Sequence, residues 1–267
     1  MSRLLAPRFL AALLPIALCA ITAFQPVSAP PETRELPAFT AVSLGTSVTV
    51  VVRQGSPQQV TVAAAPDDLP KLKTEVVNNR LRIYTEQIST QVGPLKFNPR
   101  TATLTGPVTV YVTLPIVTGL AVSGSGQLRA DSLRAPQLQL AVSGSGQLRV
   151  ARAQSRQLRL ALSGSGSLLL AQLQADSLRA SVSGSGRLAV AGTDGYADLS
   201  LSSSGSLDAA ELAIQDSQVR LSGSGNCQVR VARTLDAHLS SSGNLLVRGT
   251  PQLTSHVSGS GRVRLRQ

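Results

Sequence analysis

Apolar and polar residues alternate along most of the chain beyond residue 38. In the segment 120–130, Leu-Ala-Val precedes a Ser-Gly-Ser-Gly motif and Gln-Leu-Arg-Ala follows it. The apolar residues on each side of the motif are spaced by two, and a period of two places alternate side chains on one face of a β-strand. The segment therefore predicts two short strands that meet at a glycine-rich corner.

This unit is repeated through the second half of the chain, with corners that begin 18 to 20 residues apart. A fixed period of this size is typical of a solenoid. Stacked units would place equivalent residues ~4.8 Å apart, the spacing of hydrogen-bonded strands. We therefore predict an all-β fold, a parallel β-helix of about 20 residues per turn with two or three short strands in each turn. The eight corners begin at Ser123, Ser143, Ser163, Ser183, Ser202, Ser222, Ser240 and Ser258.

The last glycine of the motif is present in every copy, whereas the second position also accepts serine. We interpret the constant glycine as a structural corner residue with a positive φ, which a β-carbon would strain. The serine hydroxyls are expected to hydrogen-bond between neighbouring turns. The corner glycines are Gly126, Gly146, Gly166, Gly186, Gly205, Gly225, Gly243 and Gly261.

The first half of the chain is also predicted to be β-rich. Alternating segments at 46–52, 60–63 and 108–114 predict strands. Asn78-Asn79, between two further alternating segments, is typical of a hairpin. Residues 87–106 are rich in Gly, Pro and Thr, and we expect a long loop or irregular edge there.

The domain organisation follows from these patterns. We expect a flexible leader at 30–38 and a single domain at 39–267. Within that domain, residues 39–119 supply N-terminal strands and residues 120–267 supply the eight repeats.

Residues 1–29 have the features of a secretory signal peptide. Arg3 and Arg8 precede an apolar run, and small residues allow cleavage after Ala29 or, alternatively, after Ala23. Removing this segment leaves Cys227 as the single cysteine, which excludes an internal disulfide framework. We predict an exported protein, periplasmic, on the cell surface or extracellular, with no transmembrane span after signal cleavage.

Several of these segments together resemble the GIN-domain family, the head domain of autotransporter adhesins. The resemblance rests on Phe39-Thr-Ala-Val-x-Leu-Gly45, Leu81-Arg-Ile83, Val108-x-Val-x-Val-x-Leu-Pro115 and Leu120-x-Val-Ser-Gly-Ser-Gly126 with its repeats. It implies an exported, right-handed β-helix of bacterial envelopes with no established enzymatic activity. The chain has no literal Gly-Ile-Asn tripeptide. Because the sequence ends at residue 267, we do not expect an outer-membrane barrel to follow the repeats.

Charge suggests one kind of partner. The formal net charge is +11, and from residue 120 onward the chain has 15 Arg, 8 Asp or Glu and no Lys. Stacked arginines could hold phosphate or carboxylate groups of an envelope polysaccharide, although they also occur as an ordinary solvated surface. The candidate polyanion-binding residues are Arg129, Arg149, Arg159 and Arg179. Tyr196 is the sole aromatic residue of the repeats, so base stacking, and with it nucleic-acid binding, is not expected.

We expect no catalytic, metal-binding or cofactor-binding residues. His238 and His256 share an outward column in consecutive turns, but the alignment of turns places no column of carboxylates beside them, and a metal site usually needs a third ligand. Cys227 occupies an apolar column and is interpreted as a buried side chain. The acidic residues of the repeats do not share a column, unlike the gathered carboxylates of glycan-cleaving β-helices.

The sequence therefore favours a non-enzymatic, adhesin-like structural or surface-interaction module. Its expected partners are an anionic polysaccharide or another envelope protein. Two alternatives stay open: a carbohydrate-active β-helix enzyme, and a self-associating envelope scaffold that forms a homo-oligomer through the solenoid ends, where a strand edge is left free.

Overall fold

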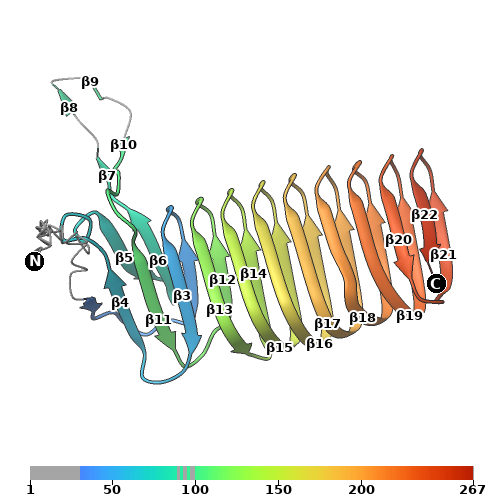
Figure 1. Ribbon diagram of the computed structural model, residues 1–267, viewed down its shortest axis with the longest axis horizontal. Helices are drawn as coiled ribbons and strands as arrows, with labels where there is room; N and C mark the ends of the chain where they lie inside the picture. The colour runs from blue at the N-terminus through green and yellow to red at the C-terminus, as the bar shows by residue number, and fades with distance from the viewer. Residues whose placement is uncertain (1–30, 89–90, 93–94, 97–99, 267) are drawn as a thin grey trace, which may run out of the picture.

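A computed structural model describes residues 31–88, 91–92, 95–96 and 100–266. The predicted signal peptide lies outside these residues. The described part of the chain is all β, and its coils stack side by side along one long axis, with the chain advancing from one end to the other (Figure 1). The prediction of a parallel β-solenoid with coils about 20 residues apart is confirmed.

Long strands form the central coils, and each pairs in parallel with the next. They are β15 (Gln147–Leu162), β16 (Ser167–Val182), β17 (Arg187–Leu201), β18 (Ser206–Leu221) and β19 (Asn226–Leu239). The flanking coils are divided into β12 (Gly119–Val122), β13 (Gln127–Arg134), β14 (Gln137–Val142), β20 (Asn244–Arg248), β21 (Gln252–Val257) and β22 (Arg262–Arg266).

The expected two or three short strands per turn are thus replaced, in the central coils, by one continuous strand that bends. In β15 the alternation of buried and exposed residues breaks at Ala151-Arg152 and again at Arg156-Gln157, where two neighbouring side chains both face solvent. The strand can bend at these points without leaving the hydrogen-bonded ladder. The Ser-Gly-Ser-Gly corner is therefore the one break in the strand of each central coil.

Stacked apolar columns form the core. Leu148, Leu168, Leu188 and Leu207 lie over one another and are at most 1% exposed. Each such leucine contributes roughly 1.5–3 kcal/mol through burial. The looser third column, predicted near Leu133, Leu173 and Leu212, is also buried. The core is therefore a thin stack of small aliphatic layers, which explains how the fold forms with few aromatic residues.

The corner glycines do not have the positive φ that the sequence suggested; among the described glycines that backbone occurs at Gly192 and Gly249. Glycine is required at the corners for a different reason. A β-carbon on Gly146 or Gly166 would lie less than 3.0 Å from a carbonyl oxygen of the preceding coil. The coils approach so closely there because main-chain hydrogen bonds continue through the corner, as from Gly146 N to Gly124 O at 3.0 Å.

Some corner serines, namely Ser123, Ser203, Ser241 and Ser258, donate to main-chain carbonyl groups of the preceding coil. Ser203 Oγ donates to Gly184 O at 2.5 Å, and Ser123 Oγ donates to Leu44 O at 3.3 Å. These bonds join neighbouring coils as expected, and main-chain oxygen atoms accept them.

The N-terminal strands are the first coils of the same sheet. β2 (Ala41–Leu44) pairs in parallel with β12 and with β6 (Arg80–Thr85). β3 (Thr49–Gln54) pairs in parallel with β13 and with β11 (Thr109–Leu114). β5 (Leu72–Val77) and β6 form the predicted hairpin, with positive φ at Asn78 and Asn79.

The segment expected to be a flexible leader contains a strand. β1 (Glu32–Arg34) pairs antiparallel with β4 (Gln59–Ala63). The Arg34 guanidinium donates to the carbonyl oxygens of Leu69 and Leu72 at 2.9 and 2.8 Å. Residues 32–34 are therefore attached to the N-terminal end of the solenoid.

The described residues between 87 and 101, which are 87–88, 91–92, 95–96 and 100–101, lie outside the stacked coils (Figure 1). They form two antiparallel pairs of two-residue strands: β7 (Gln87–Ile88) with β10 (Arg100–Thr101), and β8 (Gln91–Val92) with β9 (Leu95–Lys96). The long loop or irregular edge predicted at 87–106 lies partly outside the described residues.

Candidate functional site

The four candidate arginines lie in two separate outward columns. Arg129 and Arg149 are in register on β13 and β15, just after the corner of their coils. Arg159 and Arg179 are in register on β15 and β16, shortly before the next corner. Each predicted pair is therefore stacked as expected, but the two pairs are carried by different parts of the coil.

Arg179 differs from the other three because its charge is already matched. Its guanidinium donates to Asp198 Oδ2 at 2.9 Å, and Arg220 of a later coil donates to Asp198 Oδ1 at 2.8 Å. Asp198 is the residue opposite Arg179 in the next coil. Arg129 and Arg149 instead donate to neutral amides, those of Gln127 and Gln147.

Arginines in later coils are also paired with acids. Arg233 binds Asp216, and this guanidinium holds the pKa of the Asp216 carboxyl group below its usual value. Arg248 binds Glu211 at 2.7 Å. These contacts neutralise arginines of the middle coils, whereas Arg262, Arg264 and Arg266 at the end of the described chain have no such ion pair.

The first two coils of the repeats keep their positive charge. We call residues 120–162 the basic segment: it contains six arginines and a single acid, Asp131. That acid lies 3.8 Å from Arg53 of an adjacent strand, so it does not neutralise the segment. The arginines of the basic segment are Arg129, Arg134, Arg149, Arg152, Arg156 and Arg159.

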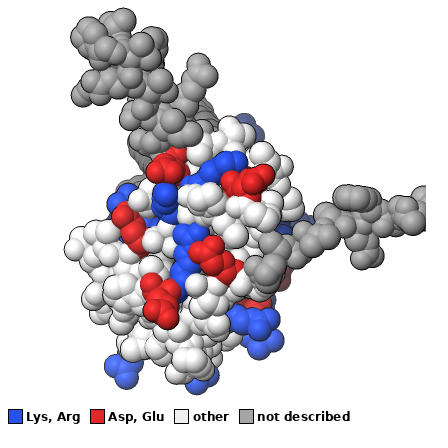
Figure 2. Space-filling model, turned by 90° about the vertical axis from the view of Figure 1, so that its left-hand side faces the viewer, with Lys and Arg blue, Asp and Glu red and all other residues white. Residues whose placement is uncertain are grey.

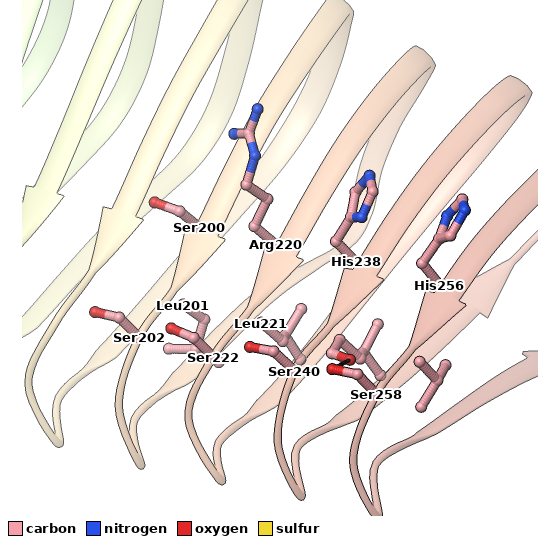
Figure 3. A pocket seen from close by; sticks show the side chains of 12 residues that line it. Ser200, Leu201, Ser202, Arg220, Leu221, Ser222, His238, Ser240, His256 and Ser258 are labelled. Atoms are coloured by element: carbon pink, nitrogen blue, oxygen red, sulfur yellow. Dashed lines mark hydrogen bonds between the residues drawn. The ribbon is translucent and has the colours of Figure 1, made fainter.

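A shallow groove follows the corners of the later coils (Figure 3). One side is a row of corner serines and the other is an outward column made by Ser200, Arg220, His238 and His256. The two imidazole rings are stacked, with centroids 5.0 Å apart and planes 10° apart. The prediction that His238 and His256 share one outward column in consecutive turns is thus confirmed.

A carboxylate, Asp236, lies beside the two histidines, and alignment of the turns did not reveal it. It lies two residues before His238 on β19, and its Oδ1 atom is 3.2 Å from His238 Nε2. Alignment of the turns shows no column of carboxylates beside the histidines, and Asp236 is a single acid between Gln218 and Thr254 of the neighbouring coils. Only comparison along the strand, where residues two apart share a face, could have found it.

Two further titratable groups are buried inside the coils. Cys227 is 1% exposed in a column of leucines, as predicted, and burial raises the pKa of its thiol to about 12. Asp194 is 4% exposed, and loss of hydration raises the pKa of its carboxyl group to about 7. The backbone N–H groups of Gly195 and Leu178 offset part of this effect, and Asp176 adds to it.

The geometry defines a class of protein: a β-solenoid with a polar, partly basic exterior and shallow surface grooves. No helix in the described part of the chain has the length and apolar character needed to cross a membrane.

The chain belongs to the family described as "Putative auto-transporter adhesin, head GIN domain", which matches residues 38–171 and 151–251. Together the two stretches cover most of the chain, which confirms the predicted family. No match was found among curated proteins.

Solved structures of proteins from two Parabacteroides species share the fold. A putative adhesin from Parabacteroides distasonis has 19% identity and a TM-score of 0.80, with 89% of this chain and 96% of that chain covered. A putative adhesin from Parabacteroides merdae has 18% identity and a TM-score of 0.78 over 89% and 96%. A putative lipid binding protein from P. distasonis has 22% identity and a TM-score of 0.77 over 89% and 97%.

Proposed function

We propose that this chain is an exported, non-enzymatic surface-interaction module that binds an anionic polymer of the cell envelope through its basic segment. The observation that carries the proposal is the charge asymmetry along the solenoid. Six arginines and one acid occupy residues 120–162, whereas later arginines such as Arg179, Arg233 and Arg248 are paired with acids.

The repeat of the solenoid suits a repeating ligand. Arg129 and Arg149 are in register on adjacent strands, so their charges recur at ~4.8 Å along the axis. Guanidinium groups bind sulfate, phosphate and carboxylate groups through charge-assisted hydrogen bonds. A polymer with closely spaced anionic groups can contact several of them at once, which strengthens weak individual contacts.

The family and the structural neighbours support an adhesin-like role. The family description refers to the head domain of an adhesin, and two solved neighbours carry the name putative adhesin. Adhesin heads act outside the cytoplasm, which is consistent with the signal peptide predicted at residues 1–29. The placement of this chain in the periplasm, on the cell surface or outside the cell is part of the proposal.

The positions of the acids favour binding over glycan cleavage. A glycosidase needs one carboxyl group with a raised pKa to act as general acid beside the scissile bond. Among the described residues, the carboxyl group with a raised pKa is Asp194, which is buried inside the coil. The half-buried Asp216 has a lowered pKa because of Arg233.

A binding assay with a charged and an uncharged form of one polymer tests the proposal. The chain without its signal peptide should bind dextran sulfate at low salt and should not bind neutral dextran. Raising the salt concentration should weaken binding, because screening acts on exposed charges. Failure to bind any polyanion at low salt would reject the proposal.

A second candidate function, self-association through the solenoid ends, is favoured by one observation. Val257 and Leu265 of the last described coil are 46% and 53% exposed. Their counterparts one coil earlier, Leu239 and Val247, are buried. Stacking of a further coil from a second molecule would cover these side chains.

The charges at the two ends of the solenoid favour head-to-tail self-association. Acidic and basic side chains intermingle on the N-terminal end (Figure 2), with ion pairs such as Lys73–Glu86 and Arg82–Glu75. β22 at the other end carries Arg262, Arg264 and Arg266. Head-to-tail stacking therefore avoids the repulsion of two basic ends. Analytical ultracentrifugation over a range of concentrations tests it, and a monomer throughout would exclude it.

A further inference from the structure

We propose that Asp236, His238 and His256 form a binding site for a divalent transition-metal ion on the outer face of the last coils. This site is separate from the basic segment, and the inference does not depend on polyanion binding. Each of the three residues offers one ligand atom, and these atoms all lie within 4.8 Å of one another. His238 and His256 are the two histidines of the entire chain.

The fold brings the three side chains together by two simple relations. Asp236 and His238 are two residues apart on β19, so both point outward from the same face. His256 lies opposite His238 in the parallel register between β19 and β21. The two histidines project side by side from neighbouring strands (Figure 3). The main chain of the solenoid, which is held by hydrogen bonds on both sides of β19, therefore fixes the spacing of all three.

The distances suit a metal ion of ordinary size. Ligand atoms about 2.0–2.2 Å from a tetrahedral metal are roughly 3.3 Å from one another. Asp236 Oδ1 and Oδ2 are 3.2 and 3.3 Å from His238 Nε2, which is already this spacing. Both imidazole groups are exposed, so His256 can rotate toward the same point without meeting packed side chains.

One carboxylate oxygen of the cluster lacks a hydrogen-bond partner. Asp236 Oδ1 is shielded from solvent and has no hydrogen-bond partner of good geometry among the described residues. A shielded carboxylate oxygen without a partner costs free energy, and a bound cation would satisfy it.

Arg220, whose positive charge would repel a cation at this site, already donates hydrogen bonds to other residues. Arg220 is opposite His238 in the preceding coil. Its guanidinium donates to Asp198 Oδ1 and Gln218 Oε1 at 2.8 and 2.7 Å, so these acceptors hold it and partly neutralise it. On the other side of Asp236 stands Thr254, an uncharged residue. Two imidazoles and one carboxylate are a donor set that suits Zn²⁺, Ni²⁺ or Cu²⁺ rather than Ca²⁺ or Mg²⁺.

The test is titration of the untagged chain, without its signal peptide, with ZnCl₂ and NiCl₂ by isothermal calorimetry. We expect one ion per chain. His238→Ala and His256→Ala should each weaken binding by at least about tenfold, and Asp236→Asn should weaken it by about tenfold. Asp208→Asn removes a carboxylate on β18, a strand that carries none of the three ligands. It is the matched control and should bind as the unmodified chain does.

Spectroscopy gives a readout that is independent of affinity. Because the chain has two histidines, its imidazole NMR signals report on this site alone, and both should shift when Zn²⁺ is added. Circular dichroism should show that each variant keeps its β structure. The proposal is overturned if the unmodified chain binds neither ion at millimolar concentration, or if any of the three ligand variants binds as tightly as the control.

Discussion

The α-carbon of Gly166 faces the main-chain carbonyl oxygen of Gly146, one coil earlier, so closely that no β-carbon fits between them. The contact is between two backbones that are held in register by hydrogen bonds on either side of the corner. Neither backbone can move away without breaking that ladder. Glycine at this position is therefore a requirement of coil stacking.

Substitution at this corner should destabilise the protein. Gly166→Ala is expected to lower the free energy of unfolding by about 1–3 kcal/mol, because the added methyl group overpacks a closely fitted site. Urea denaturation followed by circular dichroism measures the change. Ser165→Ala, one residue away and exposed, is the control and should have little effect. Equal stability of Gly166→Ala and the control would show that the corner can relax.

Asp194 should make stability depend on pH between about 4 and 7. Below this range the carboxyl group is protonated in both the folded and the unfolded chain. Within it, the unfolded chain ionises while burial keeps the folded group protonated, because the pKa of Asp194 is raised to about 7. Ionisation then favours the unfolded chain, and the free energy of unfolding falls by on the order of 4 kcal/mol as the pH rises to 7.

Urea denaturation at several pH values, compared with Asp194→Asn, isolates this effect. The variant has no carboxyl group at residue 194, so its free energy of unfolding should fall much less as the pH rises. Asp68, whose pKa is held low by Lys71, should change stability only at more acidic pH, so it does not obscure the measurement. Parallel pH profiles for the two proteins would contradict the expectation.

Arg149 and Arg179 should differ in their contribution to polyanion binding, although the sequence placed them in one group. Arg149→Ala is expected to weaken binding of dextran sulfate by about three- to tenfold at low salt, because it removes an unneutralised exposed charge. Arg179→Ala should have a smaller effect, since this guanidinium already binds Asp198. An equal loss in both variants would mean that the ion pair opens to admit the ligand.

Cys227 should be unreactive in the folded protein. Burial raises the pKa of its thiol from 9.0 to about 12, which reduces the thiolate fraction by about a thousandfold at neutral pH and adds to the steric barrier. Thiol labelling of the chain without its signal peptide should therefore be slow until urea unfolds it. Ser165→Cys supplies an exposed thiol as the control. Rapid labelling of the unmodified folded chain would show that the coil around Cys227 opens readily.

Local regularity explains why so much of the fold was predictable. Leu148, Leu168 and Leu188 recur at an exact period in an alternation of buried and outward-facing residues, so one register serves these coils. In a solenoid each coil contacts chiefly its neighbours, and the repeat therefore determines most of the tertiary contacts as well. The same regularity located the arginine columns and the neighbouring histidines.

The predictions from sequence failed for burial and side-chain pairing that do not follow from the repeat. Asp194 lies in a coil one residue shorter than those before it, near a shift in register, so its burial could not be read from alignment of the turns. Asp236 was missed because its partner is two residues along the strand and not one coil away. The pairing of Arg179 depends on Asp198, an acid in a column that also contains Arg159, Gln218 and Asp236.

The sequence by itself determined the class of fold, the coil length, the apolar columns and the family, because these follow from alternation and period. Only the tertiary structure decided why the corner needs glycine, which arginines keep their charge, and that a carboxylate accompanies the two histidines. The physical reason is that these properties depend on distances between atoms of different coils. Backbone approach, ion pairing and ligand spacing change within a few tenths of an ångström to a few ångströms, and a repeat pattern does not contain that information.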